Sequence, residues 1–358
     1  MLLESGIFKR TSPVIESILA RTSDIADDVL QKASAVQGNK TVLRKKIARN
    51  GLIHPVPAVN AEKTPFIEGV DGAFIFERTA FVDIACACGV RTGSAVESRT
   101  WMDVFGHDAA GDVFSQCVMR TMEIELAAGR QEVITLMDGS FASFVIDIKQ
   151  ELAVAVESRS DMAAFLLDLW GHDLAEKLLS VLAGDTPVLA VPKFTTRNEF
   201  LRFDDLEIPR WMDGKTVAST VLNAGEFMGP FPMTTGQDPK SWRVTHLHAI
   251  PASMDIIDAI EMAFSEMDVY YIKPMDGVPA VRIETPKKLS NLVPEWLSAI
   301  SQQFLSPAVM EPLSLYLADQ FAKEISQAFE ASKASLELMI LRHSLPEQPF
   351  LKNHRSAS

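Results

Sequence analysis

The spacing of apolar residues predicts a helical segment at the start of the chain, followed by alternating strands and helices. Apolar residues recur every three or four positions over residues 12–50, which predicts helix, and Gly38 and Asn39 are expected to interrupt it. Two prolines within residues 54–57 mark a boundary after this pattern. We therefore expect an N-terminal helical segment over residues 1–55, which is available for contact with a partner.

Shorter runs rich in β-branched and aromatic residues follow this boundary and predict strands. The predicted strands, with Arg78 at the turn between the first two, are residues 66–76, 79–90, 186–191, 242–250, 268–273 and 280–284. Residues 132–148 combine a strand, a bend and another apolar run. The predicted helices are residues 114–128, 160–183 and 293–342, whereas residues 195–239 are predicted to be irregular. Because strands and helices interleave without a fixed repeat, the predicted class is α/β.

Composition and charge exclude several classes of protein. The chain has 358 residues, of which 47% are hydrophobic and 23% charged, as in ordinary globular proteins of one large or two smaller domains. The net charge of −13 argues against a nucleic-acid coat protein and against a polybasic membrane binder, although a local basic groove is compatible with it. The basic run at residues 43–49 is either a solvated helix face or a contact for DNA or a partner.

The sequence also predicts where the protein works. No apolar stretch reaches the ~18 to 20 residues of a membrane span, so we expect no membrane contact. Glu4 and Lys9 interrupt the first residues, so no secretory signal is expected. Three cysteines complete neither a disulfide framework nor a zinc site, which favours a reducing, cytoplasmic location. His246 and His248 share one predicted strand face without a third ligand and are expected to be structural.

Two Asp-Gly pairs occur in matching contexts. Asp71-Gly72 and Asp138-Gly139 each follow an apolar strand-like run and precede a small residue and a phenylalanine. Asp-Gly is also the common dipeptide of tight hairpins, so two ordinary turns are one interpretation. The other interpretation is a metal site, because carboxylates at the ends of adjacent strands can share a divalent cation.

A predicted helix between these pairs carries two glutamates. Glu125 falls near the centre of an apolar face, and Glu123 points to nearly the opposite side. That face is formed by Phe114, Cys117, Val118, Thr121 and Met122. A carboxylate in an apolar stripe is costly unless it is paired or binds a metal, which favours Glu125 as a third ligand. Glu123 remains the alternative third ligand, because an error of one residue in the helix phase would exchange the positions assigned to Glu123 and Glu125.

These motifs, in this order, resemble those of the NurA nucleases, which are manganese-dependent DNA nucleases with an RNase H-like core that work with the hexameric HerA translocase. The resembling segments are Asp71-Gly72, the glutamate-bearing helix, residues 138–140, 188–196, 269–273, 280–286 and 311–319. Together they lie within residues 66–328. The resemblance implies an RNase H-like mixed sheet flanked by helices over residues 56–345, with C-terminal helices and a polar tail at residues 346–358.

The resemblance also implies a function. We expect hydrolysis of DNA phosphodiester bonds with Mn²⁺ (or Mg²⁺), held by Asp71, Asp138 and Glu125 or Glu123 in a two-metal arrangement, with Asp319 as a further ligand. Lys193 and Arg197 are expected to contact substrate phosphates. Because the chain has no P-loop, ATP-driven motion would come from a HerA-like hexameric ATPase. A homodimer acting in DNA-end processing or phage defence is expected.

The last motif departs from the family pattern. The family typically carries Tyr-Pro and Ala-His there, whereas this chain has Glu311-Pro312 and Ala318-Asp319. Asp319 offers oxygen ligands that suit Mn²⁺ or Mg²⁺, but Glu311 cannot supply a phenol. A NurA-like scaffold that binds the translocase or DNA without cleaving is therefore the alternative to a nuclease.

Overall fold

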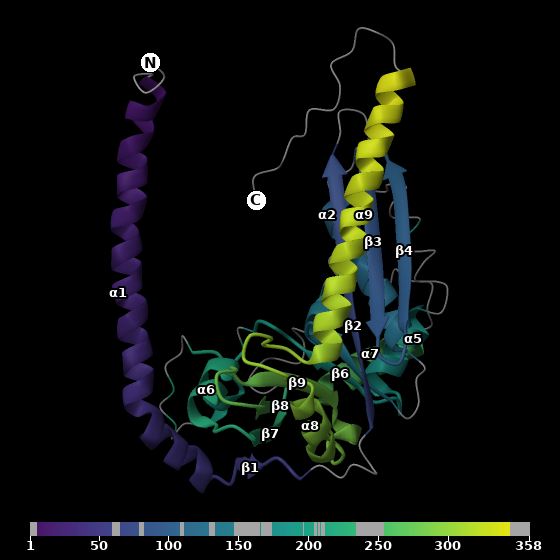
Figure 1. Cartoon of the computed structure of the whole chain (residues 1–358). Coiled ribbons are helices and arrows are strands. Elements are labelled where there is room, and N and C mark those ends of the chain that lie inside the picture. The colour runs from purple at the N-terminus through teal and green to yellow at the C-terminus, as the bar shows by residue number, and fades with distance from the viewer. Residues whose placement is uncertain are drawn as a thin grey trace.

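The computed structural model places the strands in one extended sheet with helices on both faces (Figure 1). The residues it describes are 6–58, 65–78, 82–107, 111–128, 133–146, 165, 174–195, 197–203, 206, 208, 212–233 and 254–343. The strand predicted at residues 242–250, with His246 and His248, lies outside the described residues, as does the tail at residues 346–358. Of the helix predicted at residues 160–183, the part before residue 174 also lies outside them, except residue 165.

Nine strands of the described chain form this sheet in the order β1-β7-β8-β9-β6-β5-β2-β3-β4. They are β1 (Ile53–Pro55), β2 (Phe66–Arg78), β3 (Asp83–Thr92), β4 (Val96–Phe105), β5 (Val133–Asp138), β6 (Val188–Val191), β7 (Glu226–Pro232), β8 (Met267–Lys273) and β9 (Val281–Pro286). β2, β3 and β4 form an antiparallel meander, and β5 and β6 follow parallel to β2. This arrangement confirms the expected mixed sheet with an RNase H-like core.

Helices cover the two faces of the sheet in separate groups (Figure 1). The helices are α1 (Gly6–Arg49), α2 (Gly111–Ala127), α5 (Ala175–Ala183), α6 (Gly214–Val221), α7 (Met254–Ser265), α8 (Val293–Gln302) and α9 (Leu313–His343), with short 3-10 turns η2 (Glu199–Arg202) and η6 (Lys287–Leu289). α2, α5, α6 and α7 share one apolar core with the sheet, and α8 and α9 pack on the other face. Strands buried on both faces, such as β3, are therefore apolar almost throughout.

Most of α1 projects from the body of the protein (Figure 1). Its last turns join the core through Leu43 and Ile47, which are buried, and Arg44 forms an ion pair with Glu226 of β7 at 2.7 Å. The basic run at residues 43–49 is thus partly structural. No helix among the described residues is long and apolar enough to cross a membrane.

Three predictions about secondary structure were wrong. α1 continues through Gly38 and Asn39, because a single glycine costs a helix only about 1 kcal/mol relative to alanine. The edge strand β4 was missed because it pairs only with β3 and most of its residues are exposed. Residues 195–239, predicted to be irregular, contain η2, α6 and β7, whose short lengths leave little periodic signal.

Candidate active site

Asp71 lies within β2, opposite Val90 of β3, and not at a strand end as predicted. β2 continues to Arg78 because β3 supplies partners along its full length, so Asp71-Gly72 is no hairpin turn. The Asp71 residue is 6% exposed, and its Oδ1 accepts a hydrogen bond of 2.8 Å from the backbone N–H of Gly72. The position therefore holds a carboxyl group inside the protein.

Asp138 ends β5, as the sequence predicts. β5 runs parallel to β2, with Met137 beside Val70, so Asp138 and Asp71 lie on adjacent strands. Gly139 follows with a φ of +100°, a left-handed conformation that favours glycine and turns the chain away from the sheet. The two Asp-Gly pairs thus occupy different backbone environments but bring their carboxyl groups to one place.

Lys193, which follows β6, lies among four acidic side chains. Its Nζ is 3.0 Å from Asp138 Oδ2 and 3.1 Å from Glu311 Oε2. The same atom is 3.9 Å from both Asp71 Oδ2 and Asp319 Oδ1. The structure therefore brings together four of the acidic and basic residues singled out in the sequence, and adds Glu311 to them. We call Asp71, Asp138, Glu311 and Asp319 with Lys193 the carboxylate cluster.

The charges of the carboxylate cluster are strongly coupled. Burial and, after it, the neighbouring charges of Asp138 and Glu123 raise the pKa of Asp71 to about 8, although the Lys193 ammonium and the hydrogen bond from Gly72 N–H act to lower it. Burial disfavours the charged form of Lys193, but the carboxylates of Asp138 and Asp71 outweigh burial and raise the pKa of Lys193 above its usual value. At neutral pH Lys193 is therefore charged and Asp71 retains its proton. The single ammonium faces the carboxyl groups of Asp138, Glu311 and Asp319 as well.

The structure corrects the predicted orientation of the glutamates on α2. Met119 and Glu123 lie within 3 Å of the position that a Cβ would take on Gly72, so this flank of α2 faces the sheet. Glu123 is 1% exposed and receives a hydrogen bond of 2.8 Å from Arg120. Because Gly72 has no side chain, the Glu123 carboxylate approaches the strand beside Asp71, whose pKa it raises.

Glu125 lies on another flank of the same helix. It pairs with Lys177 of α5 at 3.1 Å and with Arg99 of β4, and it takes no part in the carboxylate cluster. The apolar face near which it was placed packs on β3 and β4, since Met122 approaches Gly89 and the Phe114 ring contacts Trp101 of β4, with ring centroids 5.5 Å apart. α2 is apolar on more than one flank, and periodicity does not tell which flank meets β2 beside Asp71.

Glu311 and Asp319 come from the segment that enters α9. Glu311 precedes the helix, and Asp319 lies on it, where Lys323 also pairs with Asp319. From the sequence, Glu311 is distinguished only as a residue that cannot supply a phenol. Its spacing from Asp319, about two helical turns, was the signal that both side chains reach the same side.

Arg197 lies outside the carboxylate cluster. Burial and the charge of Arg282 lower its pKa to about 10, while Glu199 opposes this shift. Arg282 forms ion pairs with Glu199 at 2.7 Å and with Glu284. Glu284 in turn accepts a hydrogen bond of 2.8 Å from Ser140 Oγ, two residues after Asp138. This buried network, which the sequence analysis did not find, supports the turn that presents Asp138.

The cluster offers the donor set that a hard divalent cation prefers, namely carboxylate oxygens. As the side chains stand, no group of three or more His, Cys, Asp or Glu residues in the described ranges has the spacing to hold a metal ion. The cation at the centre of these carboxylates is the Lys193 ammonium. Four carboxyl groups surround this single ammonium, so the residues fit a divalent metal once Lys193 moves aside.

Comparison with known proteins identifies the fold. No protein-family model matches the chain, and no curated protein matches its sequence. Among solved structures, the NurA nuclease from Sulfolobus solfataricus superposes with a TM-score of 0.56 at 14% identity, covering 93% of this chain and 99% of that one. A NurA structure with manganese gives a TM-score of 0.51 at 12% identity, covering 90% and 98%.

A third structure, NurA bound to dAMP and manganese, gives a TM-score of 0.50 at 12% identity, covering 83% of this chain and 92% of that one. At such low identities the likeness establishes the fold alone. The protein has a NurA-like fold, which confirms the structural part of the resemblance.

Proposed function

We propose that this protein is a metal-dependent nuclease that hydrolyses phosphodiester bonds in DNA. The observation that carries the proposal is the convergence of Asp71, Asp138 and Asp319 on Lys193, with the buried Glu123 close enough to Asp71 to raise its pKa, within a NurA-like fold. Structures of NurA with manganese, and with manganese and dAMP, support Mn²⁺ or Mg²⁺ as the cofactor and a nucleotide as the ligand.

Each residue has a defined task in this proposal. Asp71, Asp138 and Glu123 would hold the metal ions, and Asp319 would contribute a further oxygen. A divalent metal held there would supply activation of the attacking water and stabilisation of the charge on the leaving oxygen. Lys193 is already charged. When metal takes the place of its ammonium group, the side chain would turn from the carboxylates toward a phosphate oxygen of the substrate. Glu125 belongs to the contact of α2 with α5 and β4.

The test compares two glutamates on one helix. Glu123→Gln and Asp138→Asn are expected to lower Mn²⁺-dependent cleavage of labelled linear DNA at least ~100-fold, because each removes a metal ligand. Glu125→Gln, the matched control, is expected to stay within a few-fold of wild type. Thermal melting checks that all three variants fold. Equal losses in both glutamine variants, or cleavage that survives Asp138→Asn or EDTA, would contradict the assignment.

A second candidate is a non-cleaving NurA-like scaffold. It is favoured by Lys193, which already supplies a cation to Asp138 and Glu311, and by the departures at Glu311 and Asp319. A folded wild type that stays inactive with Mn²⁺ or Mg²⁺, alone and with its ATPase partner and ATP, would favour this candidate.

We further propose a homodimer and a HerA-like hexameric ATPase as partners, with the protein acting in the cytoplasm in DNA-end processing or phage defence. The N-terminal part of α1 supports a partner, because it exposes a stripe of apolar side chains at heptad-like spacing. This α1 stripe consists of Ile15, Ile18, Leu19, Ile25, Val29 and Leu30, each more than half exposed. A second copy of α1 offers a matching stripe, so we assign it to the dimer contact.

A further inference from the structure

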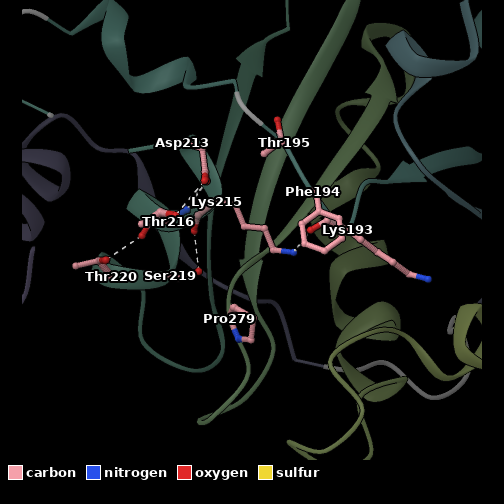
Figure 2. Close-up of a pocket in the computed structure, with 9 residues that line it drawn as sticks. All are labelled: Lys193, Phe194, Thr195, Asp213, Lys215, Thr216, Ser219, Thr220 and Pro279. Carbon is pink, nitrogen blue, oxygen red and sulfur yellow. Dashed lines mark hydrogen bonds between the residues drawn. The ribbon is translucent and has the colours of Figure 1, made fainter. Parts of the chain in front are cut away.

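A pocket of about 460 Å³ lies beside the carboxylate cluster, and Lys193 is the lining residue that the two share. The loop after β6 and the helix α6 form its walls (Figure 2). Its lining residues are Lys193, Phe194, Thr195, Asp213, Lys215, Thr216, Ser219, Thr220 and Pro279. Its volume falls in the ordinary range of small-ligand sites.

The pocket and the carboxylate cluster meet at residue 193. Lys193 points its ammonium group away from the pocket, as Figure 2 shows, and into the cluster of acidic side chains. Its backbone carbonyl instead accepts a hydrogen bond of 2.8 Å from Lys215 Nζ on the pocket side. A ligand in the pocket therefore lies beside Lys193, whose ammonium group is close to both Asp71 and Asp138.

Lys215 provides positive charge to the pocket. Burial lowers its pKa, while the charges of Asp213 and Asp138 oppose this shift. No carboxylate in the described part of the chain forms an ion pair with Lys215, and Asp213 is used as the helix cap, where it accepts from Thr216 N–H at 2.7 Å. A half-buried ammonium that donates to a backbone carbonyl alone has capacity for an anionic oxygen.

Phe194 provides an aromatic surface at the same pocket. The residue is 92% exposed, although large aromatic residues are normally buried at least in part. Flat aromatic rings exposed next to a cation are typical of surfaces on which unpaired nucleobases stack. Phe194 lies on the same loop as Lys193, whose backbone carbonyl accepts the hydrogen bond from Lys215 Nζ (Figure 2).

We propose that this pocket binds one unpaired nucleotide of the DNA strand, with its base stacked on Phe194 and its phosphate on Lys215. The inference rests on the proposed nuclease function and names the form of its substrate: a single strand or an opened end, because both faces of a base inside a duplex are already covered by its neighbours. The next phosphate of the same strand then lies at the carboxylate cluster, where the Lys193 ammonium can contact it.

Binding in EDTA tests the pocket separately from cleavage. Fluorescence anisotropy would measure the affinity of full-length protein for a labelled single-stranded oligonucleotide, an abasic oligonucleotide of equal length and a blunt duplex. Phe194→Ala is expected to weaken binding of the base-bearing strand about tenfold, and to leave the other two probes within about twofold. Phe194→Trp is expected to restore binding. Leu305→Ala, at an exposed position away from the pocket, is the control.

Lys215 is tested in the same assay. Lys215→Met is expected to weaken binding of both the base-bearing and the abasic strand, because it removes a phosphate contact, and Lys215→Arg to retain it. Lys287→Met, another exposed lysine, is the control. Phe194→Ala binding as tightly as Leu305→Ala, or losing affinity equally for the abasic strand, would overturn the proposal. A wild type that binds through Phe194 but never cleaves would contradict the nuclease and leave the pocket standing.

Discussion

At the scale of single residues, Asp71 shows how burial and charge decide the state of the site. Its carboxyl group lies at the end of the part of β2 that is buried on both faces, residues 67–71, and near the charges of Asp138 and Glu123. With a pKa of about 8, it keeps its proton at neutral pH in the metal-free protein. Metal binding must therefore release this proton, which makes metal affinity rise with pH.

This raised pKa predicts how stability depends on pH without metal. The folded state holds the Asp71 proton up to about pH 8, whereas the unfolded chain releases it near the ordinary value of 3.8. Between these values the folded state binds more protons, so the free energy of unfolding falls as pH rises, by up to about 5 kcal/mol from this group. Asp71→Asn is expected to remove most of that slope.

Urea denaturation in EDTA at about pH 5 and pH 8 measures the effect. Near pH 5 wild type should be less stable than Asp71→Asn by only about 2 kcal/mol, because the solution is little more than one pH unit above the value at which the unfolded chain loses this proton. Near pH 8 the variant should be more stable by a clearly larger margin. A parallel pH dependence in both would show that Asp71 ionises normally.

At the scale of elements, β2 lies between two helices that approach it at glycines. A Cβ on Gly69 would lie 2.3 Å from the backbone carbon of Ser314 in α9. On the opposite face, a Cβ on Gly72 would lie 2.6 Å from Met119 and 2.7 Å from Glu123 of α2. The missing side chains let α9 and α2 bring Asp319 and Glu123 to the same strand.

Gly72→Ala is therefore expected to push α2 from the sheet. The overpacking should cost about 1–3 kcal/mol of stability and should also lower cleavage, because Glu123 moves with the helix. Thermal melting and the cleavage assay measure the two effects. Gly38→Ala, at a helix position with open space around it, is the control and should stabilise α1 by up to ~1 kcal/mol. Unchanged melting and activity in Gly72→Ala would contradict the close packing.

At the scale of the whole molecule, α1 has two parts with different surroundings. Its C-terminal turns pack on the domain through Ile47 and the Arg44–Glu226 ion pair. Its N-terminal part carries the exposed α1 stripe. Exposed apolar side chains at heptad-like spacing are stable in water when another helix covers them.

The dimer proposal predicts the effect of charge on the α1 stripe. Ile18→Glu combined with Ile25→Glu is expected to shift the protein from dimer to monomer, because buried carboxylates oppose helix pairing. Size-exclusion chromatography with light scattering measures the mass. Met262→Glu, at an exposed apolar position on α7, is the control and should remain a dimer. A wild type that is already a monomer would contradict the assignment of the stripe.

Local patterns determined much of this protein. The interleaved strands and helices, the helical N-terminal segment and the end of β5 at Asp138 follow from apolar spacing and glycine positions, which act over a few neighbouring residues. The ordered motifs were sufficient to predict a NurA-like fold, which the structural comparison bears out.

Only the tertiary structure decided which side chains meet. Asp71 lies within a strand because β3 extends along β2, and Glu123 rather than Glu125 approaches Asp71 because of the flank on which α2 packs. Lys193 and Glu311 join the carboxylates through contacts between residues distant in sequence. Such contacts depend on how elements pack, and periodicity along the chain specifies a face of an element without specifying its neighbour.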